Sequence, residues 1–360
     1  EDGIGIALSG GGYRAMLFHL GTLWRLRDAG LLQQARRISS VSGGSITAGA
    51  LALAWNKIDW ADDGASFRRL VAEPIIALGR KTIDIPSALL GRIPGLSGSW
   101  VNSSYDKALF HGATLQDLPD TPRFVFNATS LHSGKLFRCS KPYLAEWTFG
   151  RWMNPTTRLS EAVAASSAFP PVLSPVTIDV SGFEFDPGEG SGRTPPRSFR
   201  LTDGGVYDNL GLETVWKRFR TIFVSDGGAG FEYQENPSGL LSLQGLRVTT
   251  MMQDQVGTLR MRQMIAGYNA PDNSPLKRDG FLASIGTPMA TGRPTGALPF
   301  AANGARELAA TKTGLRSLDE RYIHRLINWG YILTDDRLRS QPEFSNIPAP
   351  AALPFPGAPV

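Results

Sequence analysis

The chain has 360 residues, of which 42% are hydrophobic and 19% charged, a composition that buries a large core and excludes a disordered protein. Its formal charge of +5 is spread along the chain without a basic stripe, so no nucleic-acid partner is expected, whereas attraction to anionic lipid headgroups stays open. The single Cys139 excludes an internal disulfide, and the four histidines lack zinc-type spacing, so we expect no metal or other cofactor.

The membrane relationship follows from the apolar runs, none of which reaches the roughly 18 residues that a membrane span needs. A cytoplasmic or peripheral membrane location is therefore favoured. The chain starts at Glu1 rather than at methionine, which is compatible with a processed N-terminus.

The first 55 residues predict two consecutive strand-turn-helix units. Strands are expected at 4–8 and 37–41, and helices at 14–32 and 45–55. Two such units in succession favour a parallel sheet covered by helices, with ligands at the carboxyl ends of the strands.

The remainder predicts one α/β domain over residues 1–340, an excursion from the sheet at 61–121 and a Pro/Ala-rich tail at 341–360. The last residues, 348–360, are expected to be extended or disordered. Further strands are predicted at 123–128, 136–137, 176–180, 199–202 and 221–225, helices at 159–167, 248–265 and 318–332, and a Gly/Pro-rich loop at 181–196.

A serine on a sharp turn is the most informative feature of the second unit. In Ser40-Val41-Ser42-Gly43-Gly44, the turn between strand and helix would expose the hydroxyl of Ser42, as in a nucleophile elbow. Gly44 supplies the second glycine of GxSxG, and Ser40 stands in place of the first. Serines in glycine-rich turns also act as turn residues or helix caps, and Ser45 is a candidate for a cap.

Three glycines, Gly10 to Gly12, follow the first strand. Converging backbone N–H groups in front of a helix favour negative charge, which suits an oxyanion. Gly10, Gly12 and Ala15 also match GxGxxG/A, so a dinucleotide-binding unit is a competing interpretation. Arginines 36 and 37 stand where an NAD site needs an acidic residue, and an NADP site would leave the SGGS turn unexplained.

An aspartate and two glycines, Asp203-Gly204-Gly205, follow the predicted strand at 199–202. An aspartate at a strand end can project its carboxylate into a site while the backbone turns away. An ordinary Asp-Gly turn is the competing interpretation, because Asp226-Gly227-Gly228 repeats the pattern after the next strand.

In this order, GGGxR, SGGS and DGG resemble the patatin-like phospholipase family, whose members are lipid acyl hydrolases with a Ser-Asp dyad. The sequences AASSAFPP at 164–171 and DGGVYDNLG at 203–211 extend the resemblance over about the first 230 residues. It implies a three-layer α/β/α fold with a mainly parallel central sheet. It also implies Ser42 as nucleophile, Asp203 as its dyad partner, Gly10, Gly11 and Gly12 as oxyanion loop, and Arg14, Gly43, Gly44 and Gly204 as supporting residues. Ser9, where family members often have aspartate, and Ser40 depart from the family pattern.

The resemblance predicts hydrolysis of a lipid ester, of phospholipase A or lysophospholipase type, with Asp203 taking the proton of Ser42. An aspartate with a pKa near 3.9 is a weak base, so Asp203 would need desolvation. No histidine holds a recognisable triad position: His19 is expected to pack within the first helix, and a spatially adjacent histidine stays open. A catalytically weak lipid-binding or interaction protein remains an alternative, and an NADP-binding oxidoreductase a less favoured one.

Two apolar segments have two interpretations each. Residues 83–100 place leucines and isoleucines among prolines and glycines, which fits a lid or bilayer-contacting surface, with Leu89, Leu90 and Ile93 at its centre, or packing beneath a loop. The methionines Met251, Met252 and Met264 lie at helical spacing and are interpreted as core or helix-helix packing. The sequence identifies neither the lipid nor the oligomeric state.

Overall fold

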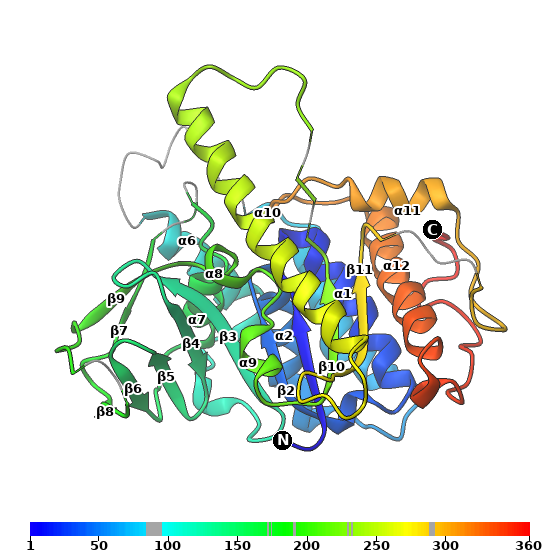
Figure 1. Ribbon diagram of the computed structural model, residues 1–360, viewed down its shortest axis with the longest axis horizontal. Coiled ribbons are helices and arrows are strands. Elements are labelled where there is room, and N and C mark those ends of the chain that lie inside the picture. The colour runs from blue at the N-terminus through cyan, green and yellow to red at the C-terminus, as the bar shows by residue number, and fades with distance from the viewer. Residues whose placement is uncertain are drawn as a thin grey trace.

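The computed structural model describes residues 1–83, 96–170, 173, 175–189, 192–228, 230, 231, 233–287 and 292–360. Within these residues, eleven strands form one sheet with helices on both faces (Figure 1). The main strand order is β11-β10-β1-β2-β3-β4-β5-β6-β8, and β9 pairs with both β3 and β7. The part from β11 to β3 is parallel, and the rest is antiparallel. The predicted three-layer α/β/α architecture is confirmed.

The strands are short, and most of those in the parallel part are buried on both faces. They are β1 (Ile4–Leu8), β2 (Ala35–Ser40), β3 (Arg123–Ser130), β4 (Leu136–Ser140), β5 (Tyr143–Glu146), β6 (Gly150–Met153), β7 (Val176–Asp179), β8 (Glu184–Asp186), β9 (Ser198–Asp203), β10 (Thr221–Asp226) and β11 (Asp279–Ser284).

The described helices vary from single turns to one of 28 residues. They are α1 (Gly12–Asp28), α2 (Gly43–Ala54), α3 (Ala65–Phe67), α4 (Glu73–Gly79), α6 (Leu96–Tyr105), α7 (Leu159–Ser166), α8 (Gly205–Asp208), α9 (Glu213–Trp216), α10 (Leu241–Tyr268), α11 (Ala302–Ala309) and α12 (Glu320–Arg339). The described part of the predicted excursion at 61–121 is helical, apart from its turns and an isolated bridge.

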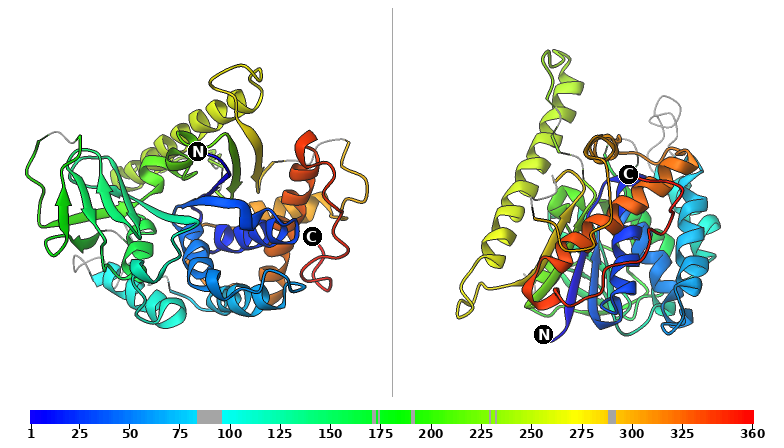
Figure 2. Two further views of the ribbon diagram at one scale, coloured as in Figure 1. Left: turned by 90° about the horizontal axis from the view of Figure 1, so that it is seen from below. Right: turned by 90° about the vertical axis from the view of Figure 1, so that its right-hand side faces the viewer.

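The two faces of the sheet are covered by helices from different parts of the chain (Figure 2). A large apolar core joins the strands to α1, α2, α4, α7 and α12. A smaller one on the opposite face is formed around Val215 of α9, Val224 of β10 and Met264 of α10. Such burial on both sides is typical of parallel strands, and explains their apolar runs.

The first and the last long helices, α1 and α12, cross in direct backbone contact. A Cβ atom added to Gly21 would overlap the carbonyl of Ile327, and one added to Gly330 would overlap the carbonyl of Phe18. Glycine is therefore required on both helices at this crossing.

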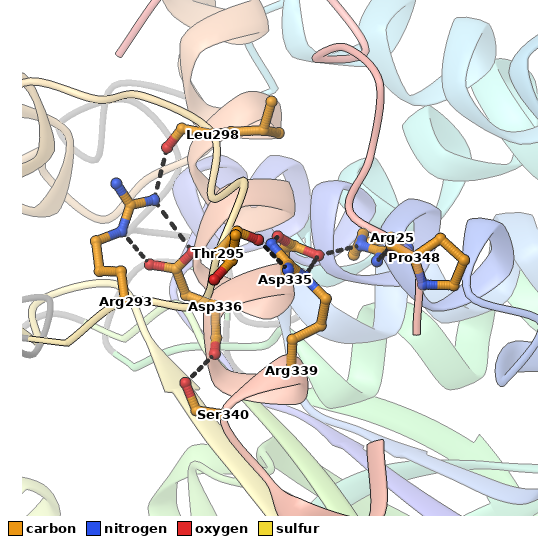
Figure 3. A network of polar contacts seen from close by, with 9 residues as sticks. All are labelled: Arg25, Arg293, Thr295, Leu298, Asp335, Asp336, Arg339, Ser340 and Pro348. Atoms are coloured by element: carbon orange, nitrogen blue, oxygen red, sulfur yellow. Dashed lines mark hydrogen bonds and ion pairs between the residues drawn. The ribbon is translucent and has the colours of Figure 1, made fainter. Parts of the chain in front are cut away.

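A buried charge network ties the same helices together (Figure 3). Asp335 accepts hydrogen bonds from Arg25 Nε (2.7 Å) and from Arg339 Nη2 (2.7 Å), and its side chain is fully buried. The neighbouring Asp336 pairs with Arg293. Since each buried carboxylate has a guanidinium partner, the network avoids unpaired buried charge.

Several elements differ from the sequence prediction. Strands β5, β6, β8 and β11 and helix α11 were not predicted. The last residues do lie without helix or strand, but they are packed: Phe355, Ala358 and Val360 are buried, and Asn328 of α12 donates to the carbonyls of Phe355 and Ala358 at 2.8 Å. Tertiary packing thus orders a segment whose composition alone resembles a disordered tail.

Candidate active site

Ser42 occupies the turn between β2 and α2 in a conformation that non-glycine residues rarely adopt, with φ 51° and ψ −119°. Its side chain is half-buried and so reachable from solvent. The turn packs closely because Gly43 and Gly44 lie against backbone. A Cβ added to Gly43 would overlap the carbonyl of Gly12, and one added to Gly44 would crowd the carbonyls of Leu8 and Ser9. The strained serine and its close-packed glycines are the geometry of a nucleophile elbow.

Buried hydroxyl groups hold this turn from below. The amide of Ser42 donates to Ser166 Oγ (3.1 Å), which in turn donates to the carbonyl of Asn127 (2.6 Å). Ser45 is no helix cap: it lies in the first turn of α2, with its hydroxyl 2.9 Å from Ser40 Oγ and 2.8 Å from Ser166 Oγ. Ser40, which replaces the usual glycine, is thus accommodated by hydrogen bonds.

Sheet register brings Asp203 next to Ser42. Ser40 of β2 pairs with Phe126 of β3, and two residues further along β3 Ala128 pairs with Asp203 at the end of β9. Ser42 lies two residues beyond Ser40, so the two side chains lie beside one another, close enough for the hydroxyl of Ser42 to lower the pKa of the Asp203 carboxylate.

Asp203 is buried, with only 2% of the residue exposed. Burial raises its pKa from 3.8 to about 7, against the opposing effect of hydrogen bonds from the amide of Gly205 (2.7 Å) and from Ser42. Gly204 allows this placement, because a Cβ there would overlap the carbonyl of Asn127. Asp203 is therefore a much stronger base than an exposed aspartate.

No histidine takes part in this pair. Of the four in the chain, all described, none is hydrogen-bonded to Ser42 or Asp203. His19 is buried between the hydroxyl of Ser225 (2.7 Å) and the carbonyl of Ser9 (2.9 Å), and burial lowers its pKa to about 4. It is thus a neutral packing residue, as the sequence suggested.

The three glycines lie beside the serine but differ in what their amides do. A Cβ on Gly10 would come within 3.2 Å of Ser42 Cβ, yet the amide of Gly10 already donates to the carbonyl of Asn209 (3.0 Å). Gly11 and Gly12 both have positive φ, 142° and 61°, and within the described residues neither amide donates to a protein group. The available donors are therefore Gly11 and Gly12, whereas Gly10 allows close approach.

Arg14 supports this loop indirectly. Its guanidinium is buried and donates to the carbonyl of Gly227 (2.8 Å), the carbonyl of Thr311 and the hydroxyl of Thr313 (3.1 Å). Burial lowers its pKa to about 10, so it stays charged at neutral pH. The backbone of Gly314 lies against Gly12 and accepts a hydrogen bond from the amide of Tyr13 (3.0 Å).

Ser9, at the position where the family often has aspartate, also binds Gly227: its hydroxyl accepts from that amide at 2.9 Å. Sequence reasoning assigned no role to Ser166, Asn209 or residues 311–314. Ser166 lies in AASSAFPP and Asn209 in DGGVYDNLG, and these family motifs were the available signal, whereas nothing in the sequence marks 311–314.

The two apolar segments have different outcomes. Leu89, Leu90 and Ile93, on which the lid hypothesis depends, lie outside the described residues. Met264 is buried, as predicted, but Met251 and Met252 are exposed, so the packing interpretation is wrong for these two. None of the described helices is both long and apolar enough to cross a bilayer.

Comparison with known proteins gives the same family as the site. The family model "Patatin-like phospholipase" matches residues 6–216. A structure of human GIVD cytosolic phospholipase A2 superposes with a TM-score of 0.54 at 13% identity, covering 92% of this chain and 60% of that one. The same enzyme in complex with methyl γ-linolenyl fluorophosphonate gives a TM-score of 0.51 at 14% identity, covering 92% of this chain and 56% of that one.

A third structure, VipD from Legionella pneumophila, gives a TM-score of 0.42 at 14% identity, over 93% of this chain and 66% of that one. A search among curated proteins found no match. The chain thus spans about three-fifths of the length of the human phospholipase that it matches. Because the family model covers more than half of the residues, including Ser42 and Asp203, the chain belongs to the patatin-like phospholipase family.

Proposed function

We propose that this protein is a lipid acyl hydrolase of phospholipase A or lysophospholipase type that works through an acyl-enzyme on Ser42. The observation that carries the proposal is the placement of the strained Ser42 beside the buried Asp203, whose pKa is raised to about 7. Family membership supports a lipid ester as substrate, because phospholipases cleave such esters.

Acylation begins when Ser42 Oγ attacks the ester carbonyl carbon while the carboxylate of Asp203 takes the hydroxyl proton. The carbonyl oxygen becomes an oxyanion, to which Gly11 and Gly12 offer their amides. The intermediate collapses as the alcohol leaves with the proton from Asp203, and the acyl group stays on Ser42 as an ester.

Deacylation repeats these steps with water. Asp203 takes a proton from a water molecule that attacks the acyl carbon, and the second oxyanion forms in the same loop. Collapse returns the proton to Ser42 and releases the fatty acid. Each proton that Asp203 accepts is thus given back, so a single carboxylate with a pKa near neutrality serves as base and acid.

The test compares wild type with Ser42→Ala on p-nitrophenyl butyrate and on lysophosphatidylcholine. We expect a loss of about 10³-fold or more in kcat, with an unchanged circular dichroism spectrum. A fluorophosphonate probe should add to wild type at Ser42, as found by peptide mass spectrometry. The matched control is Ser181→Ala, an exposed serine bonded to Asp179, which should keep full activity.

Wild-type activity in folded Ser42→Ala would refute the proposal. Failure of both substrates and of the probe in wild type would favour the alternative of a lipid-binding protein without turnover.

A further inference from the structure

The N-terminal half of α10 stands clear of the rest of the protein. In Figure 1 it rises diagonally past the sheet, and in the right-hand view of Figure 2 its upper end projects away from the other helices. The 28 residues of α10 span about 42 Å, whereas the six residues of β10 span about 20 Å. A large part of the helix therefore has no sheet to pack on.

The contacts of α10 show which half is anchored. The hydroxyl of Tyr268 donates to the carbonyl of Ile222 at the amino end of β10 (2.8 Å), and Met264 is fully buried. Arg260 pairs with Asp208 and Glu213, shortly after the end of β9 that carries Asp203. Residues 241–253, which precede these anchored positions, consequently extend beyond the edge of the sheet where Ser42 and Asp203 lie.

This free half carries apolar side chains in water. Leu241 is 85% exposed and Met252 63%. The other exposed apolar residues of this half are Leu240, Leu243, Leu246, Val248 and Met251. At about 100° per residue, the seven positions cover roughly two-thirds of the helix circumference. A helix that docks in a protein groove or on a second copy needs a single apolar stripe. Because the apolar positions here spread over more than one face, they fit contact with lipid on several sides of a helix that enters the bilayer surface by its N-terminal end.

The charges of the free half agree with a lipid medium. From Leu240 to Gln253 the sequence has no carboxylate, and its one charge is Arg247, which stacks on Phe231 at 4.4 Å. Lys312, next to the residues that hold Arg14, is exposed and adds a second positive charge outside the helix. Insertion of residues 240–253 into a membrane therefore brings no carboxylate into the lipid or next to lipid phosphates.

We propose that residues 240–253 insert into the headgroup and upper acyl region of a phospholipid bilayer and dock the edge of the sheet that carries Ser42 on it. The inference deepens the proposed function, since it names a lipid surface as the source of the ester. It differs from the lid hypothesis, because it concerns another segment and requires no movement over the site.

The test measures binding to vesicles of diether phosphatidylcholine and diether phosphatidylglycerol, which contain no ester to hydrolyse. Wild type should co-sediment with the vesicles, and Leu241→Gln/Leu243→Gln/Met252→Gln should partition at least about tenfold more weakly. Glutamine preserves helix propensity, so the fold should be retained. The matched control is Leu259→Gln/Ile265→Gln, two exposed residues on the anchored half of the same helix, and should bind within about twofold of wild type.

Equal binding of the triple variant and wild type, or no binding of wild type, would overturn the inference. A wild-type dimer that the triple variant dissociates, as measured by light scattering, would assign the surface to a second copy instead. Hydrolysis of soluble p-nitrophenyl butyrate, which needs no vesicle, should be unchanged in both variants. This separates failure of the docking surface from failure of the proposed catalysis.

Discussion

Replacing Asp203 by asparagine should stabilise the folded protein above neutral pH while removing the proposed base. Because the folded-state pKa is raised, from 3.8 to about 7, the native protein holds a proton that the unfolded chain has already lost. The stabilisation is complete below the unfolded pKa and is lost as pH rises through the folded one. At 1.36 kcal/mol per unit, the full shift corresponds to about 4 kcal/mol.

The assay is urea unfolding of wild type and Asp203→Asn across this range. Between about pH 4.5 and about pH 8.5, the free energy of unfolding of wild type should fall by about 3 kcal/mol relative to the variant, because other titrating groups cancel in the difference. Asp62→Asn is the control. Asp62 is partly buried and its pKa is lowered, by hydrogen bonding to Ser66 above all, so the difference in the free energy of unfolding between wild type and this variant should stay flat over this range.

A wild-type-minus-variant difference that does not change between the two pH values would refute the reasoning, since it would mean that Asp203 keeps an ordinary pKa. Kinetics give an independent check. The kcat/KM of wild type for p-nitrophenyl butyrate should fall about tenfold per pH unit below an apparent pKa near 7, because protonated Asp203 cannot accept the proton of Ser42.

Three other predictions concern stability and support of the turn. Gly330→Ala should cost at least about 3 kcal/mol in urea unfolding, because the new Cβ overlaps the carbonyl of Phe18 and two helices must move apart. Asp335→Asn should cost about 3 to 5 kcal/mol by the same measurement, since two buried guanidinium groups lose their carboxylate; a loss below 1 kcal/mol would contradict the buried network. Ser166→Ala should lower kcat roughly tenfold or more with little change in KM, because the amide of Ser42 loses its acceptor. A kcat equal to that of wild type would show that the turn keeps its conformation without this hydrogen bond.

Much of the parallel core was predictable from sequence. Short apolar runs followed by glycine turns and helices mark β1, β2 and β10, since burial on both faces leaves a local signature. The strained turn at Ser42 was also predictable, because small residues must surround it. Placing Asp203 next to it was possible only through family resemblance: β9 is antiparallel to β3, and this register depends on a contact between residues far apart in the chain.

What was missed depends on long-range packing. Strand β11 begins with Asp279 and Gly280, which locally resemble a turn, and it is a strand because β10 offers a free edge. The order of the last residues depends on Asn328, whose amide and carbonyl both bind the backbone there. Local propensity contains neither piece of information.

Residues 311–314 support the glycine loop, and this affects when, during synthesis, the protein can begin to cleave esters. Gly12 is packed on Gly314, and Arg14 reaches Thr311, although the matched family region ends at residue 216. During synthesis, Ser42 and Asp203 emerge from the ribosome long before these backbone groups. We therefore expect a nascent chain whose residues 311–314 are still inside the ribosome to lack ester cleavage, although Ser42 and Asp203 are already outside it.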